Sequence, residues 1–220
     1  MASIAPLEST DEAQLTMALR LSGGRRLRSP RGEVARPTTG RVRAAVMNML
    51  AGELRGCRWL DLCGGSGVMA CEALQRGAQE VVVVEKDRRV AAVARDNLAL
   101  AAAGLSHAGG AAPTVEVLEQ EALRFLGQGA AASGVGCFDL IYADPPWAAQ
   151  LHRPLAEAVM AGGWLAPGGT LVWECPRGMA EQPPAGWRER RRRVYGCSEV
   201  VLLENDGFSL FRSTAEGLHP

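Results

Sequence analysis

The sequence predicts an α/β protein built on a mostly parallel, doubly wound β-sheet. From Cys57 onward, short apolar runs alternate with helical patterns, the order expected when each strand returns through a helix. The first run leads into a glycine-rich turn, Cys63-Gly64-Gly65-Ser66-Gly67, which lets a ligand approach the backbone. The second run ends at Glu85, about 20 residues after the first of these glycines, where nucleoside-binding folds hold ribose hydroxyls. Such turns occur in many α/β folds, and an exposed acid favoured by the next helix dipole is the alternative interpretation of Glu85.

The chain of 220 residues is long enough for one such domain and an appendage. Residues 1–16 are polar and small without a period, so we expect a disordered tail. Residues 17–55 should form the appendage: a short hairpin around Gly23-Gly24, then a helix capped by Thr38 or Thr39 and ended by Gly52 or Gly56. The main domain is expected over residues 56–205, and residues 206–220 form a C-terminal tail.

Within the main domain the apolar runs predict seven strands, the last two joined at Gly196 as an antiparallel pair at one edge. Helices are expected over 68–76 and 87–103, then a short one through 123–126, and another from the loop after Asp144 to about Met160. A turn is expected over 164–169. The expected strands cover residues 58–62, 81–84, 114–118, 138–143, 170–175, 187–195 and 199–204.

One strand runs into an unusual loop, Asp144-Pro145-Pro146-Trp147. Neither proline has an N–H to donate and each fixes its own φ, so the backbone after Asp144 is stiff and cannot continue a ladder. The loop offers a carboxylate, a free carbonyl and a flat indole, which together suit a planar base carrying an exocyclic amine. A Pro-Pro turn with a packing tryptophan is the alternative interpretation.

Charge and composition narrow the class of partner. The net charge is zero, but eight arginines fall between positions 20 and 43, opposed there only by Glu33, and five more lie within 188–193. Two basic clusters favour a polyanion partner, although charge runs are often only solvated faces. No apolar run is long enough to span a membrane and no secretory signal is evident. The six cysteines include no C-x-x-C pair, so we expect no metal site and reduced thiols in a cytoplasmic protein.

Several stretches resemble the RsmD family of bacterial 16S ribosomal RNA (guanine-N2)-methyltransferases, over roughly residues 19–205. The chain departs from the family pattern in three places: Cys63 and Gly64 replace an aromatic and an alanine, Gly40 and Ala44 replace two acids, and Trp147 stands where phenylalanine is usual. The matching stretches are Leu21-Ser22-Gly23-Gly24, Arg36-Pro37-Thr38-Thr39 with Arg41-Val42-Arg43, Asp61 through Gly67, Glu85-Lys86-Asp87-Arg88, and Asp144-Pro145-Pro146-Trp147.

The resemblance implies a class I S-adenosylmethionine-dependent methyltransferase, with a Rossmann-like seven-stranded sheet, a terminal antiparallel hairpin and an RNA-binding hairpin-helix appendage. It implies a monomer that acts on small-subunit ribosomal RNA or on the assembled small subunit, with S-adenosyl-L-methionine as cofactor. The implied catalytic residues are Asp144, Pro145, Pro146 and Trp147. Those implied for the cofactor are Asp61, Gly64, Gly65, Gly67, Glu85, Lys86, Glu121 and Asp144, with Glu85 on the ribose and Glu121 near the adenine. Those implied for RNA are Arg25, Arg26, Arg28, Arg36, Thr38, Thr39, Arg41 and Arg43.

Two other functions stay open at this point. The acid-Pro-Pro-aromatic loop is shared with methyltransferases of other amines, for example adenine N6 in DNA or a protein side chain. A non-catalytic RNA-binding or assembly protein that kept the fold is the second. The Arg-Pro-Thr-Thr segment argues against the first and the intact Asp144 loop against the second.

Overall fold

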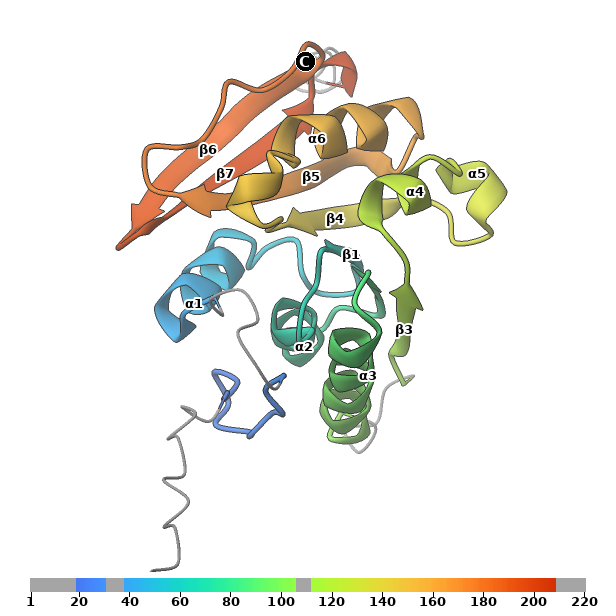
Figure 1. Ribbon diagram of the computed structural model, residues 1–220, viewed down its shortest axis with the longest axis vertical. Coiled ribbons are helices and arrows are strands. Elements are labelled where there is room, and N and C mark those ends of the chain that lie inside the picture. Colours follow the sequence, from blue (N-terminus) through green and yellow to red (C-terminus); the bar gives the residue numbers. More distant parts are fainter. Residues whose placement is uncertain (1–18, 31–37, 106–111, 209–220) are drawn as a thin grey trace, which may run out of the picture.

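A computed structural model describes residues 19–30, 38–105 and 112–208 of the chain (Figure 1). Its centre is a seven-stranded sheet in the order β3-β2-β1-β4-β5-β7-β6, in which only the pairs made by β7 are antiparallel. The seven strands and the terminal hairpin at one edge are therefore as predicted. The strands are β1 (Arg58–Leu62), β2 (Glu80–Glu85), β3 (Thr114–Glu119), β4 (Phe138–Ala143), β5 (Leu165–Pro176), β6 (Trp187–Tyr195) and β7 (Ser198–Asn205).

Helices cover both faces of the sheet (Figure 1). One apolar core joins α1, α2 and α3 to one face, and a second joins α4 and α6 to the other. The central strands are buried because both of their faces are covered, which is why they read as continuous apolar runs. The helices are α1 (Gly40–Met49), α2 (Val68–Gln75), α3 (Arg88–Ala103), α4 (Ala122–Leu126), α5 (Ala130–Ser133) and α6 (His152–Ala161), with 3₁₀ turns η1 (Trp147–Ala149) and η2 (Asp206–Phe208).

The N-terminal hairpin packs onto the main domain instead of standing apart from it. Arg20 and Arg26 form an antiparallel bridge, and the Leu27 N–H donates to the Leu19 carbonyl over 2.8 Å. Leu19, Leu21 and Leu27 are buried in the same core as α1, α2 and α3. The hairpin was predicted, and its alternation of apolar and basic residues explains its amphipathic packing. The expected tail 1–16 and residues 209–220 lie outside the described residues.

Three features of the fold differ clearly from expectation. Helix α1 ends at Met49, before either glycine, because the chain turns at Leu50 with that residue fully buried. The predicted turn at 164–169 lies inside β5: Phe138 pairs with Leu165 and Leu140 with Thr170, so the residues between bulge out of the ladder. Helix α5 was not expected, since its four residues between left-handed Gly129 and Gly134 are too few to show a period.

No helix in the described ranges is both long and apolar enough to cross a membrane. All six cysteines fall within these ranges and carry free thiols, three of them buried.

Candidate active site at the carboxyl edge of the sheet

The glycine-rich loop turns tightly between β1 and α2. The Gly64 N–H donates to the Val84 carbonyl over 3.0 Å, and the Gly67 N–H donates to the Gly64 carbonyl over 2.8 Å. A Cβ at Gly64 would lie 2.4 Å from Cγ1 of Val83, so this loop has no room for the alanine that is usual there. Cys63 adopts a left-handed backbone (φ 61°), and burial raises the pKa of its thiol to about 12. The thiol therefore stays neutral at physiological pH.

Asp61, on β1 just before this loop, is a buried carboxylate with an unfilled bonding position. Its side chain accepts from the backbone N–H of Ala70, while Oδ2 has no hydrogen-bond partner among the described residues. Burial, and then the negative charges of Asp144 and Glu85, raise its pKa well above the usual range. An unpartnered acceptor in such surroundings favours a ligand that brings a cation or an N–H group.

Glu85 ends β2 and holds the loop from the neighbouring strand. Its Oε2 accepts from the Gly65 N–H over 3.0 Å and its Oε1 from the Asp87 N–H over 2.8 Å. Each carboxylate oxygen keeps a further lone pair, so the side chain can still accept from hydroxyl groups. Lys86 follows it and is exposed at the start of α3.

Glu121 has a structural role that the sequence interpretation did not foresee. It is the N-cap of α4, and its two oxygens accept from the Leu123 N–H over 3.1 Å and the Arg124 N–H over 2.8 Å. It stands two residues beyond β3, whose last residue, Glu119, is in register with Glu85. Its place at the carboxyl edge is therefore that of the expected cofactor residue, but its side chain is committed first to the helix.

Asp144 lies one residue beyond β4, beside Glu174 of β5. The last pair of that ladder is Ala143 with Trp173, so the next residues along each strand are Asp144 and Glu174, on the same face as Tyr142. Burial, and then the charge of Glu174, raise the pKa of Asp144 to about 7, opposed by a hydrogen bond from Thr38. Glu174 is buried, and its raised pKa reflects that burial; it accepts from the Tyr142 hydroxyl.

The indole of Trp147 is half-buried in η1, next to the two prolines. Its ring centroid lies 6.0 Å from that of His152, whose Nε2 is 2.7 Å from the Glu174 carbonyl oxygen. The Pro146 carbonyl closes a turn by accepting from the Ala149 N–H, and the Pro145 carbonyl has no hydrogen-bond partner among the residues the structure describes. The loop therefore places a carbonyl without an internal hydrogen bond beside a carboxylate and a half-buried ring.

Thr38 joins the N-terminal segment to this loop. Its hydroxyl donates to Oδ2 of Asp144 over 3.4 Å, although 106 residues separate the two in sequence. Thr39 caps α1 by accepting from the Val42 N–H, so the helix begins at the edge of the Asp144 loop. The two threonines of the Arg-Pro-Thr-Thr segment thus have defined positions, while Arg36 lies outside the described residues.

The arginines expected to bind RNA fall into different groups. Arg26 and Arg41 are exposed. Arg25 donates to the Leu100 carbonyl, and the exposed guanidinium of Arg28 pairs with Asp96. Both side chains of the N-terminal segment therefore contact α3. Arg43 is a correction: it is buried and donates to Glu72, to the Thr38 carbonyl and to the Arg20 carbonyl. Its guanidinium anchors α1 to α2 and to the hairpin, so it is not available to phosphates.

Two residues important to the site were missed in the sequence. Glu174 is an acid in the middle of an apolar strand, Leu171 to Cys175, and that interruption was the available signal. Asn97 is fully buried on α3, and its amide donates to the carbonyls of Arg28 and Ser66 while its oxygen accepts from the Arg28 N–H. No feature of the sequence distinguishes Asn97 from an exposed helix residue. Within the described ranges, no group of His, Cys, Asp or Glu has an arrangement that could hold a metal ion.

Comparisons with known proteins find one matching family model and several relatives that are named as methyltransferases. The family described as Conserved hypothetical protein 95 matches residues 21–204. The chain is 30% identical over 184 residues to the Ribosomal RNA small subunit methyltransferase D of Escherichia coli, covering 83% of this chain and 86% of that one. It is also 30% identical to the Putative rRNA methyltransferase YlbH of Bacillus subtilis, covering 84% and 95%. The solved structure of the putative methyltransferase yhhF from Escherichia coli superposes with a TM-score of 0.68 at 28% identity, covering 86% and 98%. The fold is thus that of the class I methyltransferases.

Proposed function

Because this chain belongs to the Conserved hypothetical protein 95 family, the RsmD family of ribosomal RNA methyltransferases, we propose that it methylates the exocyclic N2 amine of a guanine in small-subunit ribosomal RNA, with S-adenosyl-L-methionine as methyl donor. The observation that carries this proposal is the position of the Asp144 loop. Strands β1 and β4 are adjacent and parallel, and their last pair is Leu62 with Ala143, so the glycine-rich loop and the Asp144 loop leave the same end of the sheet side by side. The charge of Asp144 also raises the pKa of buried Asp61.

The residues at this edge fit S-adenosylmethionine. The cofactor carries an ammonium and a sulfonium, and the edge offers Asp61, Glu85 and Asp144, with Asp61 Oδ2 unpartnered among the described residues. Asp61 and the backbone of Gly64, Gly65 and Gly67 would hold the methionine end, Glu85 the ribose hydroxyls, and Lys86 and Glu121 would border the nucleoside. Bound there, the cofactor supplies an electrophilic methyl group on its sulfonium.

The Asp144 loop would act on the amine. A guanine N2 lone pair is delocalised into the ring, so the amine is a poor nucleophile. Hydrogen bonds from the amine to the Asp144 carboxylate and to the open Pro145 carbonyl favour a tetrahedral nitrogen and stabilise the positive charge that develops on it. Pro146 keeps the loop stiff, and Trp147 offers a ring on which the base can stack once it has left its own stack.

Recognition of the RNA falls to the N-terminal segment in this proposal. Arg26 and Arg41 present exposed guanidinium groups, which bond phosphate oxygens in pairs. Thr38 and Thr39 lie at the Asp144 loop, close to where the target nucleotide would enter. We place the enzyme in the cytoplasm, where the RNA or the assembling small subunit is found, and we expect it to act as a monomer.

Replacing Asp144 with alanine tests the proposal. Methyl transfer to small-subunit RNA should be abolished, because the amine loses its charged acceptor, while S-adenosylmethionine should bind within a few-fold. Radiolabelled methyl transfer followed by mapping of the modified nucleotide measures the first quantity, and calorimetry measures the second.

Asp96→Ala, which removes an exposed acid of α3, is the control and should keep its activity. The proposal fails if the wild-type protein methylates DNA or a protein in preference to RNA, or if Asp144→Ala retains near-normal turnover.

A further inference from the structure

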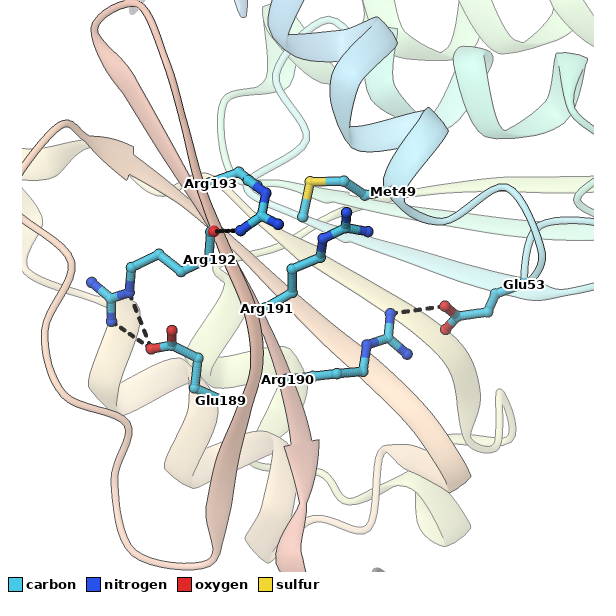
Figure 2. A pocket seen from close by; sticks show the side chains of 7 residues that line it. All are labelled: Met49, Glu53, Glu189, Arg190, Arg191, Arg192 and Arg193. Atoms are coloured by element: carbon cyan, nitrogen blue, oxygen red, sulfur yellow. Dashed lines mark hydrogen bonds and ion pairs between the residues drawn. The ribbon is translucent and has the colours of Figure 1, made fainter.

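A second basic surface lies away from the Asp144 loop, between α1 and the edge strand β6. It is a cleft of about 690 Å³ (Figure 2). Five of its seven lining residues are charged residues of β6, and α1 and the turn after it supply the rest. The lining residues are Met49, Glu53, Glu189, Arg190, Arg191, Arg192 and Arg193.

Half of the arginines in this cleft are already neutralised. Arg190 pairs with Glu53 over 2.8 Å and with Glu204 over 3.2 Å. Arg192 pairs with Glu189 over 2.7 Å and with Glu199 over 2.9 Å. Arg191 and Arg193 are exposed, and neither has a carboxylate within ion-pair distance in the part of the chain that the structure describes; Arg193 donates only to the Arg192 carbonyl. The cleft therefore keeps two guanidinium groups outside any ion pair, although the four arginines and the four glutamates paired with Arg190 and Arg192 balance in charge.

A bulge in β6 directs these two side chains to the side of α1. Glu189 pairs with Leu203 and Arg191 with Leu202, so Arg190 is the extra residue. Beyond the bulge, Arg191 and Arg193 are in register with Leu202 and Val200, which belong to the core on the α1 face. Tyr195 follows on that face and its hydroxyl lies 3.4 Å from the Met49 sulfur. Figure 2 shows both guanidinium groups on the same side of the strand as Met49.

Helix α1 links this cleft to the active site. Its N-terminus follows Thr38, which bonds Asp144, and its last residue, Met49, lines the cleft. The helix has ten residues, so the two sites are separated by about 15 Å, at 1.5 Å for each residue. That is about four base steps at the 3.4 Å rise of a nucleic-acid strand. Exposed Arg41 lies on the same helix, between the two sites.

Resting on the proposed function, we infer that Arg191 and Arg193 bind backbone phosphates of the substrate RNA a few nucleotides from the target guanine. The planar guanidinium fork matches phosphate oxygens, and two such groups two residues apart on one face of a strand can hold the same or adjacent phosphates. The ion pairs of Arg190 and Arg192 with glutamates hold the strand in place, while the guanidinium groups of Arg191 and Arg193 remain free to bind phosphate. This second phosphate contact lies one length of α1 from the Asp144 loop, and it therefore restricts which nucleotides reach that loop.

The test is the salt dependence of RNA binding by the Arg191→Gln/Arg193→Gln double variant. Its affinity for a small-subunit RNA fragment or for purified small subunits should fall about tenfold at moderate salt. The slope of log K against log salt should flatten by about 1.4 to 1.8, which is about 0.7 to 0.9 for each phosphate that the variant no longer binds. Its affinity for S-adenosylmethionine should equal that of the wild type. Replacement of both arginines by lysine should keep the slope and lose only part of the affinity, because the charge remains without the fork.

The matched control is Arg95→Gln/Arg153→Gln, which removes the same charge from exposed arginines already paired with Glu119 and Glu157. Equal loss of slope in the control, or an unchanged slope in the Arg191/Arg193 variant, would overturn the inference. So would a response of the cleft to inorganic phosphate with none to RNA. Binding needs no turnover, so absence of methylation by the wild type would contradict the proposed function alone, and an unchanged slope would contradict the phosphate cleft alone.

Discussion

Asp144, one residue beyond β4, lies beside Glu174 of β5, and the negative charge of Glu174 makes the Asp144 carboxyl harder to ionise. Among the groups near Asp144, Glu174 repels its charge and the Thr38 hydroxyl stabilises it, and the charge of Asp144 in turn raises the pKa of buried Asp61. The Tyr142 hydroxyl donates to Glu174 and holds that side chain in place. Asp144 therefore changes its protonation state near neutral pH, where an isolated aspartate would be fully charged.

This arrangement predicts the pH dependence of the reaction. Only ionised Asp144 accepts hydrogen bonds from an amine at both oxygens, so kcat/KM for RNA should rise as pH increases through about 7. Glu174→Gln removes the repelling charge, lowers the pKa of Asp144 and should move the rising limb to lower pH. Initial rates measured across the neutral range check both statements. Glu157→Gln, at an exposed site on α6, should leave the profile in place; an unmoved limb in Glu174→Gln would contradict the coupling.

At the scale of elements, Asn97 connects three parts of the molecule. From its buried position on α3 it bonds the backbone of the hairpin at Arg28 and of the glycine-rich loop at Ser66. Arg43 makes a second connection, from α1 to buried Glu72 of α2. The hairpin, α1 and the glycine-rich loop are therefore held as one unit by buried polar groups whose partners are backbone or charged.

Asn97→Ala should break the first connection. It leaves backbone groups of Arg28 and Ser66 without a partner, which should lower the free energy of unfolding by about 1–3 kcal/mol. Affinities for both S-adenosylmethionine and RNA should fall together, because Ser66 and the hairpin lose the same anchor. Urea unfolding and calorimetry measure these quantities.

The neighbouring residue provides the control. Asp96→Ala removes only the exposed ion pair with Arg28, which should contribute less than about 1 kcal/mol. If Asn97→Ala weakened RNA binding with unchanged cofactor affinity, hairpin and loop would be independent.

Prediction from the sequence succeeds for elements that neighbouring residues determine and fails for contacts between residues distant in the chain. Strands β1, β2 and β4 were predictable because both of their faces are buried, so most of their residues are apolar. The Asp144 loop was predictable because prolines fix the backbone locally. The Thr38 contact with Asp144 spans 106 residues and the Arg43 pair with Glu72 spans 29, so neither could be derived from local pattern. An arginine next to Val42 on a helix has the same sequence signature whether it is buried against a glutamate or exposed.

At the scale of the whole molecule, acids are concentrated toward the carboxyl ends of the central strands. Burial raises the pKa values of Asp61, Asp144 and Glu174, and the charges of neighbouring carboxylates add to the effect at Asp61 and Asp144. The folded state thus binds protons more tightly than the unfolded chain. For Asp144 the resulting stabilisation is present below the unfolded pKa of about 4, and it is lost as pH rises through about 7.

Asp144→Asn should therefore stabilise the folded protein above pH about 7 while it abolishes activity. The gain should be roughly 1–3 kcal/mol, since one pKa unit corresponds to about 1.4 kcal/mol and partial solvent screening reduces the total. Near the unfolded pKa the variant and wild type should be equally stable. Urea unfolding at an acidic and a weakly alkaline pH measures the difference; equal stability of the two proteins at both would contradict this account.

The bulge at Arg190 has a consequence for how the protein behaves at high concentration. Strand β6 is an edge of the sheet, and an edge strand offers unpaired backbone groups to any other extended chain. The bulge interrupts the regular spacing of those groups, and the arginines from 188 to 193 bring like charges together when two such edges approach. Arg191 and Arg193, which we assign to the nucleic acid, thus also help the bulge to disfavour pairing of this edge with another chain. A variant without these arginines should therefore aggregate more readily at its edge strand and also bind RNA less tightly.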